Sequence, residues 1–293
     1  MLSIIIPVFN EEGVIESTIR TLHETLTSSG EEFEIVAVDD GSSDGTVKIL
    51  SDLKLQELTI ITHPQNRGYG ASVKSGIRHS KGELIGTVDA DGTYPLKDFP
   101  LLLTRLRERK ADMVVGARTK RGVQIPLIRR PAKAVLNILA NALSGMRIPD
   151  LNSGMRIFTR ELAERFMHLY PQRFSFTITI TLAALTNDYI VSYVPIDYYT
   201  RKGKSTLSSG MNGLKNFVNF LGIVVRIITY FRPLRFFIWP SLALLAAGTI
   251  MIVHTLRTES NVSDSGMLLL LTGLQIGLFG LLAEVVVRNR GTK

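Results

Sequence analysis

Two long apolar runs near the end of the sequence constrain the fold more than any other feature. The first, residues 236–256, contains no aspartate, glutamate, lysine or arginine over its 21 residues, and about 20 such residues let a helix cross a bilayer. The second, residues 266–287, holds one charge, that of Glu284. Buried core helices are the alternative, but two runs separated only by the polar residues 257–265 favour a membrane hairpin. We therefore predict a two-helix transmembrane hairpin over residues 235–293.

The charges that flank the hairpin predict its orientation. Positive residues lie on both outer flanks, whereas the connecting loop carries only Arg257. The flanking residues are Arg232, Arg235, Arg288, Arg290 and Lys293. Because positive residues mark the cytoplasmic side of a membrane, we expect a multi-pass protein of the cell membrane whose large N-terminal part is cytoplasmic.

Residues 211–234 precede the hairpin and have apolar side chains near helical spacing, with polar side chains beside them. This pattern predicts an interfacial amphipathic helix that lies on membrane lipid. A helix packed on the globular domain is the alternative, and a third membrane span is a weaker one.

Residues 1–210 alternate short β-rich runs with helical stretches, which is typical of a parallel sheet with crossover helices. The predicted strands are residues 3–8, 34–38, 58–62, 84–88 and 113–115, and the predicted helices are residues 12–27, 46–53, 70–79 and 96–109. The chain starts without a basic stretch and a cleavage site, so we expect no cleaved signal peptide. It has no cysteine, which excludes disulfides, zinc–thiolate sites and thiol nucleophiles.

A pair of aspartates, Asp89 and Asp91, directly follows the predicted strand 84–88. Ligands of open α/β sheets bind outside the carboxyl ends of the strands. Two carboxylates separated by one residue can hold one hard cation, and Gly92 frees the turn that follows. A solvated acidic turn is the alternative for this pattern taken alone. Its position after a buried strand favours a site for Mg²⁺ or Mn²⁺.

A second acidic turn begins with Asp39 and Asp40, after the predicted strand 34–38. A carboxylate at this position can accept the N–H of uracil or guanine. The alternative is a loop whose Asp44 or Ser43 caps the next helix. The turn at residues 66–70 is also rich in hydrogen-bonding groups, but it lacks the full dinucleotide-binding fingerprint.

Seven short motifs occur in a fixed order and together cover residues 3 to about 206. They are Ile6-Pro7-Val8-Phe9-Asn10-Glu11, Val38-Asp39-Asp40-Gly41-Ser42-Ser43-Asp44-Gly45-Thr46, Asn66-Arg67-Gly68, Asp89-Ala90-Asp91, Gly116-Ala117-Arg118, Asp150-Leu151-Asn152-Ser153-Gly154 and Arg201-Lys202-Gly203-Lys204-Ser205. Each motif is modest by itself, but the ordered set resembles the family 2 inverting glycosyltransferases. Within that family it is similar to the polyprenyl-phosphate sugar synthases, the dolichol-phosphate mannose synthase and bactoprenol glucosyltransferase type, some of which end in a two-helix hairpin.

The resemblance implies a Rossmann-like nucleotide-sugar-binding domain of the GT-A type. It implies that Asp89 and Asp91 serve the metal and the diphosphate, and that Ser153 lies near the reaction centre. The nucleotide pocket would be lined by Pro7, Asn10, Glu11, Asp39, Asp40, Asn66 and Gly68. The acceptor phosphate would face Arg118, Arg129, Arg130, Arg201 and Lys204. The expected catalytic residues are Asp89, Asp91, Arg118, Ser153 and Arg201.

Two departures from the family pattern concern these assignments. Many members have Leu-Gln where this chain has Gly92-Thr93, so a glutamine contact to the metal is missing and is replaced by Thr93, by water or by nothing. The segment at residues 118–131 aligns least well, so Arg129 and Arg130 are alternatives to each other.

The resulting hypothesis is a metal-dependent, inverting transfer of a sugar from a nucleoside-diphosphate-sugar to a polyprenyl phosphate at the cytoplasmic membrane face. A cation stabilises the leaving diphosphate, and arginines offset the repulsion between two anionic substrates. The formal charge of +8 suits such an acceptor better than nucleic acid, which we do not expect as a partner. The alternatives are another lipid or a polysaccharide as acceptor, or a non-catalytic membrane adaptor that binds a nucleotide-sugar.

Glycines in the hairpin would permit close packing of helices, including packing in a homo-oligomer. They are Gly248, Gly273, Gly277 and Gly280. The sequence leaves the oligomeric state open, together with the sugar and the choice of uridine or guanosine.

Overall fold

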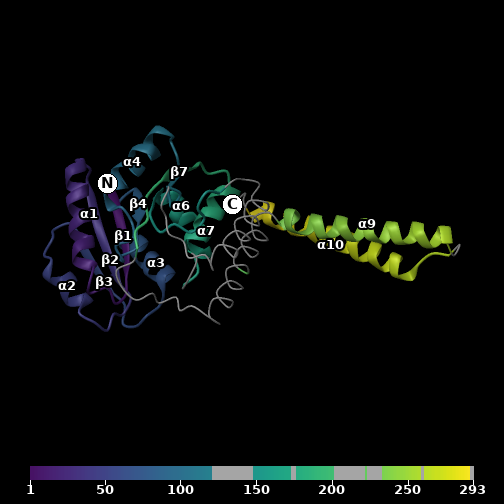
Figure 1. The fold of residues 1–293 in the computed structure, drawn as a ribbon, viewed down its shortest axis with the longest axis horizontal. Helices are drawn as coiled ribbons and strands as arrows, with labels where there is room; N and C mark the ends of the chain where they lie inside the picture. The colour runs from purple at the N-terminus through teal and green to yellow at the C-terminus, as the bar shows by residue number, and fades with distance from the viewer. Residues whose placement is uncertain (121–147, 173–175, 201–221, 223–232, 259–260, 291–293) are drawn as a thin grey trace.

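The chain forms an α/β domain from which a long helical hairpin projects (Figure 1). The structure is a computed structural model and describes residues 1–120, 148–172, 176–200, 222, 233–258 and 261–290. Most of the predicted interfacial helix at 211–234 therefore lies outside the described residues, and it stays a prediction.

One sheet of seven strands organises the described part of the α/β domain, in the order β3-β2-β1-β4-β6-β5-β7. The strands are β1 (Leu2–Val8), β2 (Phe33–Asp39), β3 (Leu58–Thr62), β4 (Leu84–Thr87), β5 (Met113–Ala117), β6 (Arg156–Thr159) and β7 (Val191–Pro195). All five predicted strands are present, with ends that differ by at most two residues. The five predicted strands run in the same direction, as expected, whereas β6, which was not predicted, runs antiparallel to both β4 and β5.

The reversal of β6 follows from where the chain enters the sheet. The preceding segment, residues 150–155, lies at the carboxyl end of β4, and Arg156 at the start of β6 pairs with Thr87 at the end of β4. A strand that begins at this edge must run back across the sheet. No hydrophobic pattern distinguishes that direction, so only the structure reveals it.

Helices cover both faces of the sheet. They are α1 (Ile15–Ser29), α2 (Thr46–Asp52), α3 (Tyr69–His79), α4 (Phe99–Glu108), α6 (Arg160–Arg165) and α7 (Phe176–Thr186), with the 3-10 turns η1 (Leu96–Asp98) and η3 (Met167–Leu169). Side chains of a strand alternate between the faces, so Ile4 packs with α1, α2 and α4, whereas Ile5 packs with α3, α6 and α7. Two hydrophobic layers thus hold the strand ends in place.

The sequence patterns did not predict α7, a helix in which every residue is buried. Its apolar residues cover the whole circumference, so the helical period that marks a half-exposed helix is missing.

The hairpin consists of α9 (Pro233–Thr258) and α10 (Asp264–Arg290). Both helices are long and apolar enough to cross a membrane, and only 11% and 17% of their apolar windows are buried. Large side chains point outward, with Trp239 71% and Leu268 66% exposed. This exposure contradicts the alternative of buried core helices and confirms the predicted hairpin.

The hairpin glycines lie between its two helices. A β-carbon on Gly248 would come within 2.8 Å of the Gly266 carbonyl oxygen, and one on Gly273 would contact Leu245 at 3.0 Å. The hydroxyl of Ser241 also donates to the carbonyl of Gly273 at 2.8 Å. These small residues therefore serve close packing within one chain, and they are no argument for a homo-oligomer.

Glu284, the single charge inside the second apolar run, has a structural partner. Its Oε2 accepts a hydrogen bond from the backbone N–H of Leu234 at 3.2 Å, in the first turn of α9. The first N–H groups of a helix lack intrahelical partners, and a carboxylate also interacts favourably with the helix dipole there. Glu284 thus caps the helix that opposes it.

Candidate active site

Three loops meet at the carboxyl edge of the sheet. The adjacent parallel strands β2, β1 and β4 end there, with Val8 of β1 in register with Asp39 of β2. The loops that follow these strands carry Asn10 and Glu11 after β1, Asp40 after β2, and Asp89 and Asp91 after β4. Open α/β sheets bind ligands at this edge, so the sheet order assembles the expected site from distant parts of the chain.

Asp89 lies two residues beyond β4 and is enclosed by protein. Burial raises the pKa of its carboxyl group to about 6, and the nearby Asp91 adds to the effect, while Tyr69, Arg118 and Arg156 oppose it. Its Oδ1 is buried and accepts no hydrogen bond of ordinary geometry from the described residues, although the Tyr69 hydroxyl is near enough to lower the pKa of this carboxyl group by hydrogen bonding. A buried carboxylate oxygen left without a well-formed hydrogen bond is costly. It is therefore the atom of the site that best fits a cation ligand.

Asp91 is held by its neighbour Thr93. The Asp91 Oδ1 atom accepts hydrogen bonds from the Thr93 amide at 3.2 Å and from the Thr93 hydroxyl at 2.6 Å. The intervening Gly92 has φ of 70°, a left-handed conformation that glycine adopts without strain. Thr93 is buried, and its hydroxyl donates a hydrogen bond to Asp91, so it orients this carboxylate.

Gly154 packs directly against the carboxylate of Asp89. A β-carbon on Gly154 would lie 2.6 Å from Asp89 Oδ1. The Gly154 amide donates to the hydroxyl of Tyr94 at 2.7 Å, and its carbonyl accepts from the hydroxyl of Thr87 at 2.8 Å. These bonds clamp the segment before β6 against the aspartates.

Ser153 does not present its hydroxyl to a substrate, although it was expected near the reaction centre. The residue is fully buried, and its hydroxyl donates to the carbonyl of Gly116 at 2.6 Å. The side chain therefore fastens the Gly154 segment to β5, and a catalytic role of Ser153 stays a prediction.

Arg156 is a buried cation that the sequence analysis missed. Its guanidinium donates to the carbonyls of Ser153 and Thr177, the latter at 3.0 Å, and to the Thr181 hydroxyl at 2.9 Å. It thereby joins α7 to the segment that covers Asp89. The only signal in the sequence was an arginine among the apolar residues that open β6.

Arg118 forms a bidentate ion pair with Asp150. The two hydrogen bonds measure 2.7 Å from Nε and 2.9 Å from Nη2, and Asp150 is 1% exposed. The guanidinium also lies 5.1 Å from the ring centroid of Tyr198. The fork that was expected to face an acceptor phosphate is therefore already engaged by a carboxylate.

Asn10 links the loop after β1 to the loop after β2 by hydrogen bonds. This residue has φ of 54°, a conformation that is unusual outside glycine. Its amide donates to the Ser42 hydroxyl at 2.9 Å, and its side-chain oxygen accepts from the Ser43 amide at 2.8 Å. The Glu11 amide likewise donates to the hydroxyl of Thr46 at 2.9 Å. The expected nucleotide-binding segments thus form one connected surface.

Asp39 and Asp40 differ in how their oxygens are used. Asp39 Oδ2 accepts the amides of Gly41 and Ser42, both at 3.2 Å, while its buried Oδ1 has no donor in the part of the chain that the structure describes. Asp40 accepts from the His63 ring and from two backbone amides. The sequence analysis did not single out His63.

The other expected site residues fall into two groups, one within and one outside the described residues. Pro7 lies in β1 and Gly68 directly before α3, while Asn66 is exposed in the turn between β3 and α3. The expected acceptor-binding residues Arg129, Arg130, Arg201 and Lys204 lie outside the described residues.

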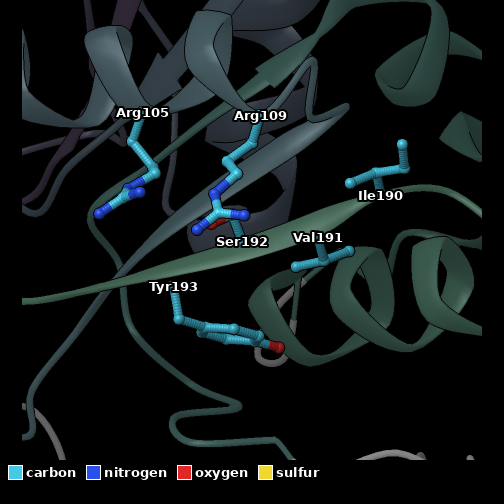
Figure 2. A pocket seen from close by; sticks show the side chains of 6 residues that line it. All are labelled: Arg105, Arg109, Ile190, Val191, Ser192 and Tyr193. Carbon is cyan, nitrogen blue, oxygen red and sulfur yellow. The ribbon is translucent and has the colours of Figure 1, made fainter.

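A hollow of about 450 Å³ lies elsewhere, between α4 and the edge strand β7 (Figure 2). Arg105 in α4 and Arg109, directly after this helix, reach over it, and residues 190–193 form its floor. Residues 191–193 begin β7, which runs parallel to β5, so the hollow lies at the amino ends of these strands, away from the aspartates at the carboxyl ends. We assign it no part in the site.

Comparison with known proteins decides the family. Residues 3–167, more than half of the chain, match the model of glycosyl transferase family 2. The chain is a family 2 glycosyltransferase. Residues 232–288 of this glycosyltransferase match a second model, the GtrB C-terminal hairpin, which coincides with α9 and α10. The two expectations drawn from the ordered motifs and from the apolar runs are thereby confirmed.

Three curated relatives cover most of the glycosyltransferase. The low-salt glycan biosynthesis hexosyltransferase Agl6 of Haloferax volcanii is 28% identical over 97% of this chain and 68% of its own length. The dolichyl-phosphate beta-glucosyltransferase ALG5D of Trichomonas vaginalis is 30% identical over 76% of this chain and 72% of its own length. The dodecaprenyl-phosphate galacturonate synthase of Rhizobium johnstonii is 23% identical over 98% of this chain and 88% of its own length.

A solved structure supports the fold. Glucosyl-3-phosphoglycerate synthase of Mycobacterium tuberculosis, crystallised with Mn²⁺, UDP and phosphoglyceric acid, superposes with a TM-score of 0.59 over 78% of each chain. At 16% identity this similarity concerns the fold alone, and it confirms the predicted α/β architecture of the GT-A type.

Proposed function

We propose that this glycosyltransferase moves a sugar from a nucleoside-diphosphate-sugar to a polyprenyl phosphate at the membrane surface. The observation that carries the proposal is the buried Asp89, whose Oδ1 accepts no hydrogen bond of ordinary geometry from the described residues, beside Asp91 at the carboxyl edge of the sheet. This edge belongs to a chain that also ends in an apolar hairpin. A nucleotide-sugar site and a membrane anchor on one chain suit a donor from the aqueous phase and an acceptor from the bilayer.

The named relatives support this class of acceptor. One is described as a dolichyl-phosphate glucosyltransferase and another as a dodecaprenyl-phosphate galacturonate synthase. Both dolichyl and dodecaprenyl phosphate are polyprenyl-type lipids whose long tail remains in the membrane. The exposed apolar surface of α9 and α10 gives the protein the same location.

Asp89 and Asp91 fit a divalent cation, Mg²⁺ or Mn²⁺. Among the described residues no group of three His, Cys, Asp or Glu side chains is arranged to hold a metal. Such cations accept a few carboxylates when substrate phosphate and water supply the other ligands, so a two-carboxylate site is sufficient. When bound, the cation supplies positive charge for the leaving diphosphate.

The surrounding residues hold this pair in position. Thr93 orients Asp91 by its hydrogen bond of 2.6 Å, while Tyr94 and Thr87 keep Gly154 against Asp89. Ligand geometry that is fixed by outer residues is the usual requirement of a metal site. We therefore assign Thr93 to orientation of Asp91.

The transfer is a single displacement with inversion. An oxygen of the acceptor phosphate attacks the anomeric carbon and forms the new C–O bond, while the bond to the nucleoside diphosphate breaks and its electron pair leaves with the diphosphate. The phosphate monoester has its second pKa near 6, so its oxygen is already anionic near pH 7. The protein therefore needs no strong general base, and its task is to hold two anions close together.

Basic side chains are proposed for that task. Arg129 or Arg130, with Arg201 and Lys204, remain the residues that we assign to the acceptor phosphate. Arg118 acts through its ion pair with Asp150, which stiffens the two segments around the site. Asp39, whose buried Oδ1 has no donor among the described residues, and Asp40 are the carboxylates that we assign to the nucleobase. Pro7, Asn10, Glu11, Asn66 and Gly68 are assigned to the same pocket.

We infer the following arrangement in the membrane. The glycosyltransferase domain spans residues 1–210, an interfacial helix spans residues 211–234 and the hairpin spans residues 235–293. The positive outer flanks of the hairpin favour a cytoplasmic catalytic domain. Cysteines introduced into the domain and into the loop after Arg257, labelled from outside intact cells, test this orientation.

A donor panel tests the function. Purified protein in liposomes with Mn²⁺ or Mg²⁺, labelled UDP- and GDP-sugars and a polyprenyl phosphate is expected to yield a chloroform-soluble sugar product. Asp91→Ala is expected to abolish the product while the protein still inserts into membranes. A chloroform-soluble product from Asp91→Ala at the wild-type rate contradicts the metal role, and no product with any donor contradicts the function.

The panel also separates the alternatives. A water-soluble or polymeric product indicates a different acceptor. Nucleotide-sugar binding without turnover indicates an adaptor, although the presence of both Asp89 and Asp91 argues against that alternative.

A further inference from the structure

His63 is a buried histidine that contacts no expected substrate group but lies behind the nucleotide side of the site. It follows β3 directly, and its side chain is 5% exposed. Its Nδ1 is 2.7 Å from Oδ1 of Asp40, and its Nε2 is 2.8 Å from the hydroxyl of Ser75 in α3. Both ring nitrogens are thus committed, and the ring has one fixed orientation.

Asp40 transmits this orientation to the next loop. Its Oδ1 also accepts the amide of Arg67 at 2.9 Å, and its Oδ2 accepts the amide of Gly68 at 2.7 Å. Gly68 has φ of 98° and leads directly into α3. One carboxylate therefore holds the backbone of the turn that carries the Asn66-Arg67-Gly68 motif.

The two loops leave little room for adjustment. A β-carbon on Gly41, the residue after Asp40, would lie 2.7 Å from the backbone of Gln65. A carboxylate offers about four acceptor positions, and three of those of Asp40 are filled by His63, Arg67 and Gly68. The remaining acceptor position of Asp40 is on Oδ2. A nucleobase N–H could bond there only while the plane of the carboxylate is fixed.

We propose that His63 is a positioning residue for nucleoside recognition. Its Nδ1 contact sets the plane of the Asp40 carboxylate and, through it, the turn at residues 66–68. Loss of this contact weakens binding of the nucleoside part of the donor and leaves the sugar-transfer step nearly unchanged. The inference rests on the proposed function, because it assigns the nucleoside to the loops of Asp40 and Gly68.

A purely structural role makes a different prediction. A histidine that only fills its buried site contributes to folding stability, so every substitution lowers the melting temperature and none affects donor binding selectively. The two roles therefore differ in the ratio of the effects on donor KM and kcat, which thermal stability does not determine.

Asparagine and glutamine at position 63 form a matched pair. The Asn amide nitrogen occupies nearly the place of Nδ1 and can donate to Asp40, whereas the longer Gln places its amide near Nε2 and Ser75. Ser75→Ala removes only the second contact. The four variants His63→Asn, His63→Gln, His63→Leu and Ser75→Ala are compared in the liposome transfer assay and by calorimetric titration with UDP and GDP.

His63→Asn and Ser75→Ala are expected to keep the donor KM and the nucleotide Kd within about threefold of wild type. His63→Gln and His63→Leu are expected to raise both constants by about tenfold or more, because a hydrogen bond to a charged group is lost. The kcat values should change by less than about threefold in all four, because the transition-state contacts remain.

Equal nucleotide affinity of His63→Asn and His63→Gln overturns the proposal, and so does a loss of kcat with unchanged Kd. If His63→Leu does not fold, the Asn and Gln variants decide. A wild-type protein that neither binds nucleotide nor transfers sugar contradicts the proposed function itself, whereas an active wild type with indifferent variants contradicts only the role of His63.

Discussion

The α-carbon of Gly154 lies against the carboxylate of Asp89, so that a β-carbon at this position would come within 2.6 Å of Oδ1 and 2.7 Å of Oδ2. Real β-carbons do not approach other atoms so closely. The site therefore requires glycine in the Asn152-Ser153-Gly154 motif for reasons of space, since Gly154 is not among the left-handed glycines of the described residues.

Gly154→Ala is expected to displace Asp89 and to lower metal affinity and kcat/KM by about tenfold or more, because small displacements of a catalytic group are costly. Mn²⁺ titration followed by paramagnetic resonance and the transfer assay measure the two effects. Gly13→Ala is the control, since a β-carbon on Gly13 meets no atom within 4 Å. Wild-type Mn²⁺ affinity in Gly154→Ala contradicts the metal assignment of Asp89.

The raised pKa of Asp89 predicts how the metal-free protein responds to pH. Because the folded pKa of about 6 exceeds the value near 4 of an unfolded aspartate, the carboxyl group destabilises the fold above pH 6, and this cost disappears as the pH falls toward 4. Asp89→Asn removes the charge and is expected to stabilise the metal-free protein at pH 8 by roughly 1–3 kcal/mol.

Thermal unfolding in EDTA at pH 8 and pH 5 measures this difference, which should shrink at the lower pH. Added Mn²⁺ should raise the melting temperature of wild type and leave that of Asp89→Asn unchanged. A melting temperature that Mn²⁺ raises equally in both proteins contradicts the assignment.

The ion pair of Arg118 and Asp150 predicts a strong coupling. Arg118→Met leaves the buried Asp150 without its partner and is expected to destabilise the protein by about 3–5 kcal/mol. Asp150→Asn is expected to have a similar cost, while the double variant costs less than the sum because no charge is left uncompensated. Denaturation of the three variants completes a double-mutant cycle.

Transfer kinetics show whether Arg118 also contacts the acceptor. We expect Arg118→Met and Asp150→Asn to affect the KM values of donor and acceptor alike. A rise confined to the acceptor KM in Arg118→Met, with Asp150→Asn unaffected, refutes a role through Asp150 alone.

The hairpin contact between Glu284 and Leu234 predicts a capping effect. Glu284→Leu removes the acceptor of the Leu234 amide and is expected to destabilise the hairpin by about 1 kcal/mol, the usual cost of a lost cap, whereas Glu284→Gln retains an oxygen and should cost less. Val285→Leu is a neutral control, because Val285 is 59% exposed on the outer surface. Unfolding in mixed micelles is the measurement, and equal stability of the Leu and Gln variants refutes the cap.

The sequence analysis was most successful where a local pattern has one physical meaning. Residues 58–62 were predicted as a strand and form β3 with the same bounds. The analysis failed at β6 and α7, because a short strand and a wholly buried helix lack a characteristic period. The roles expected of Ser153 and Arg118 stay predictions, and no motif indicated their contacts with Gly116 and Asp150.

The sequence by itself determined that the chain joins an α/β domain to two long apolar helices, because both the length of the apolar runs and the alternation of strand and helix patterns are local features. Only the tertiary structure decided which loops meet: Gly154 with Asp89, Arg118 with Asp150, and His63 with Asp40. These contacts depend on the strand order, above all on the insertion of β6 between β4 and β5. Strand order is a property of packing between distant segments, which no local pattern contains.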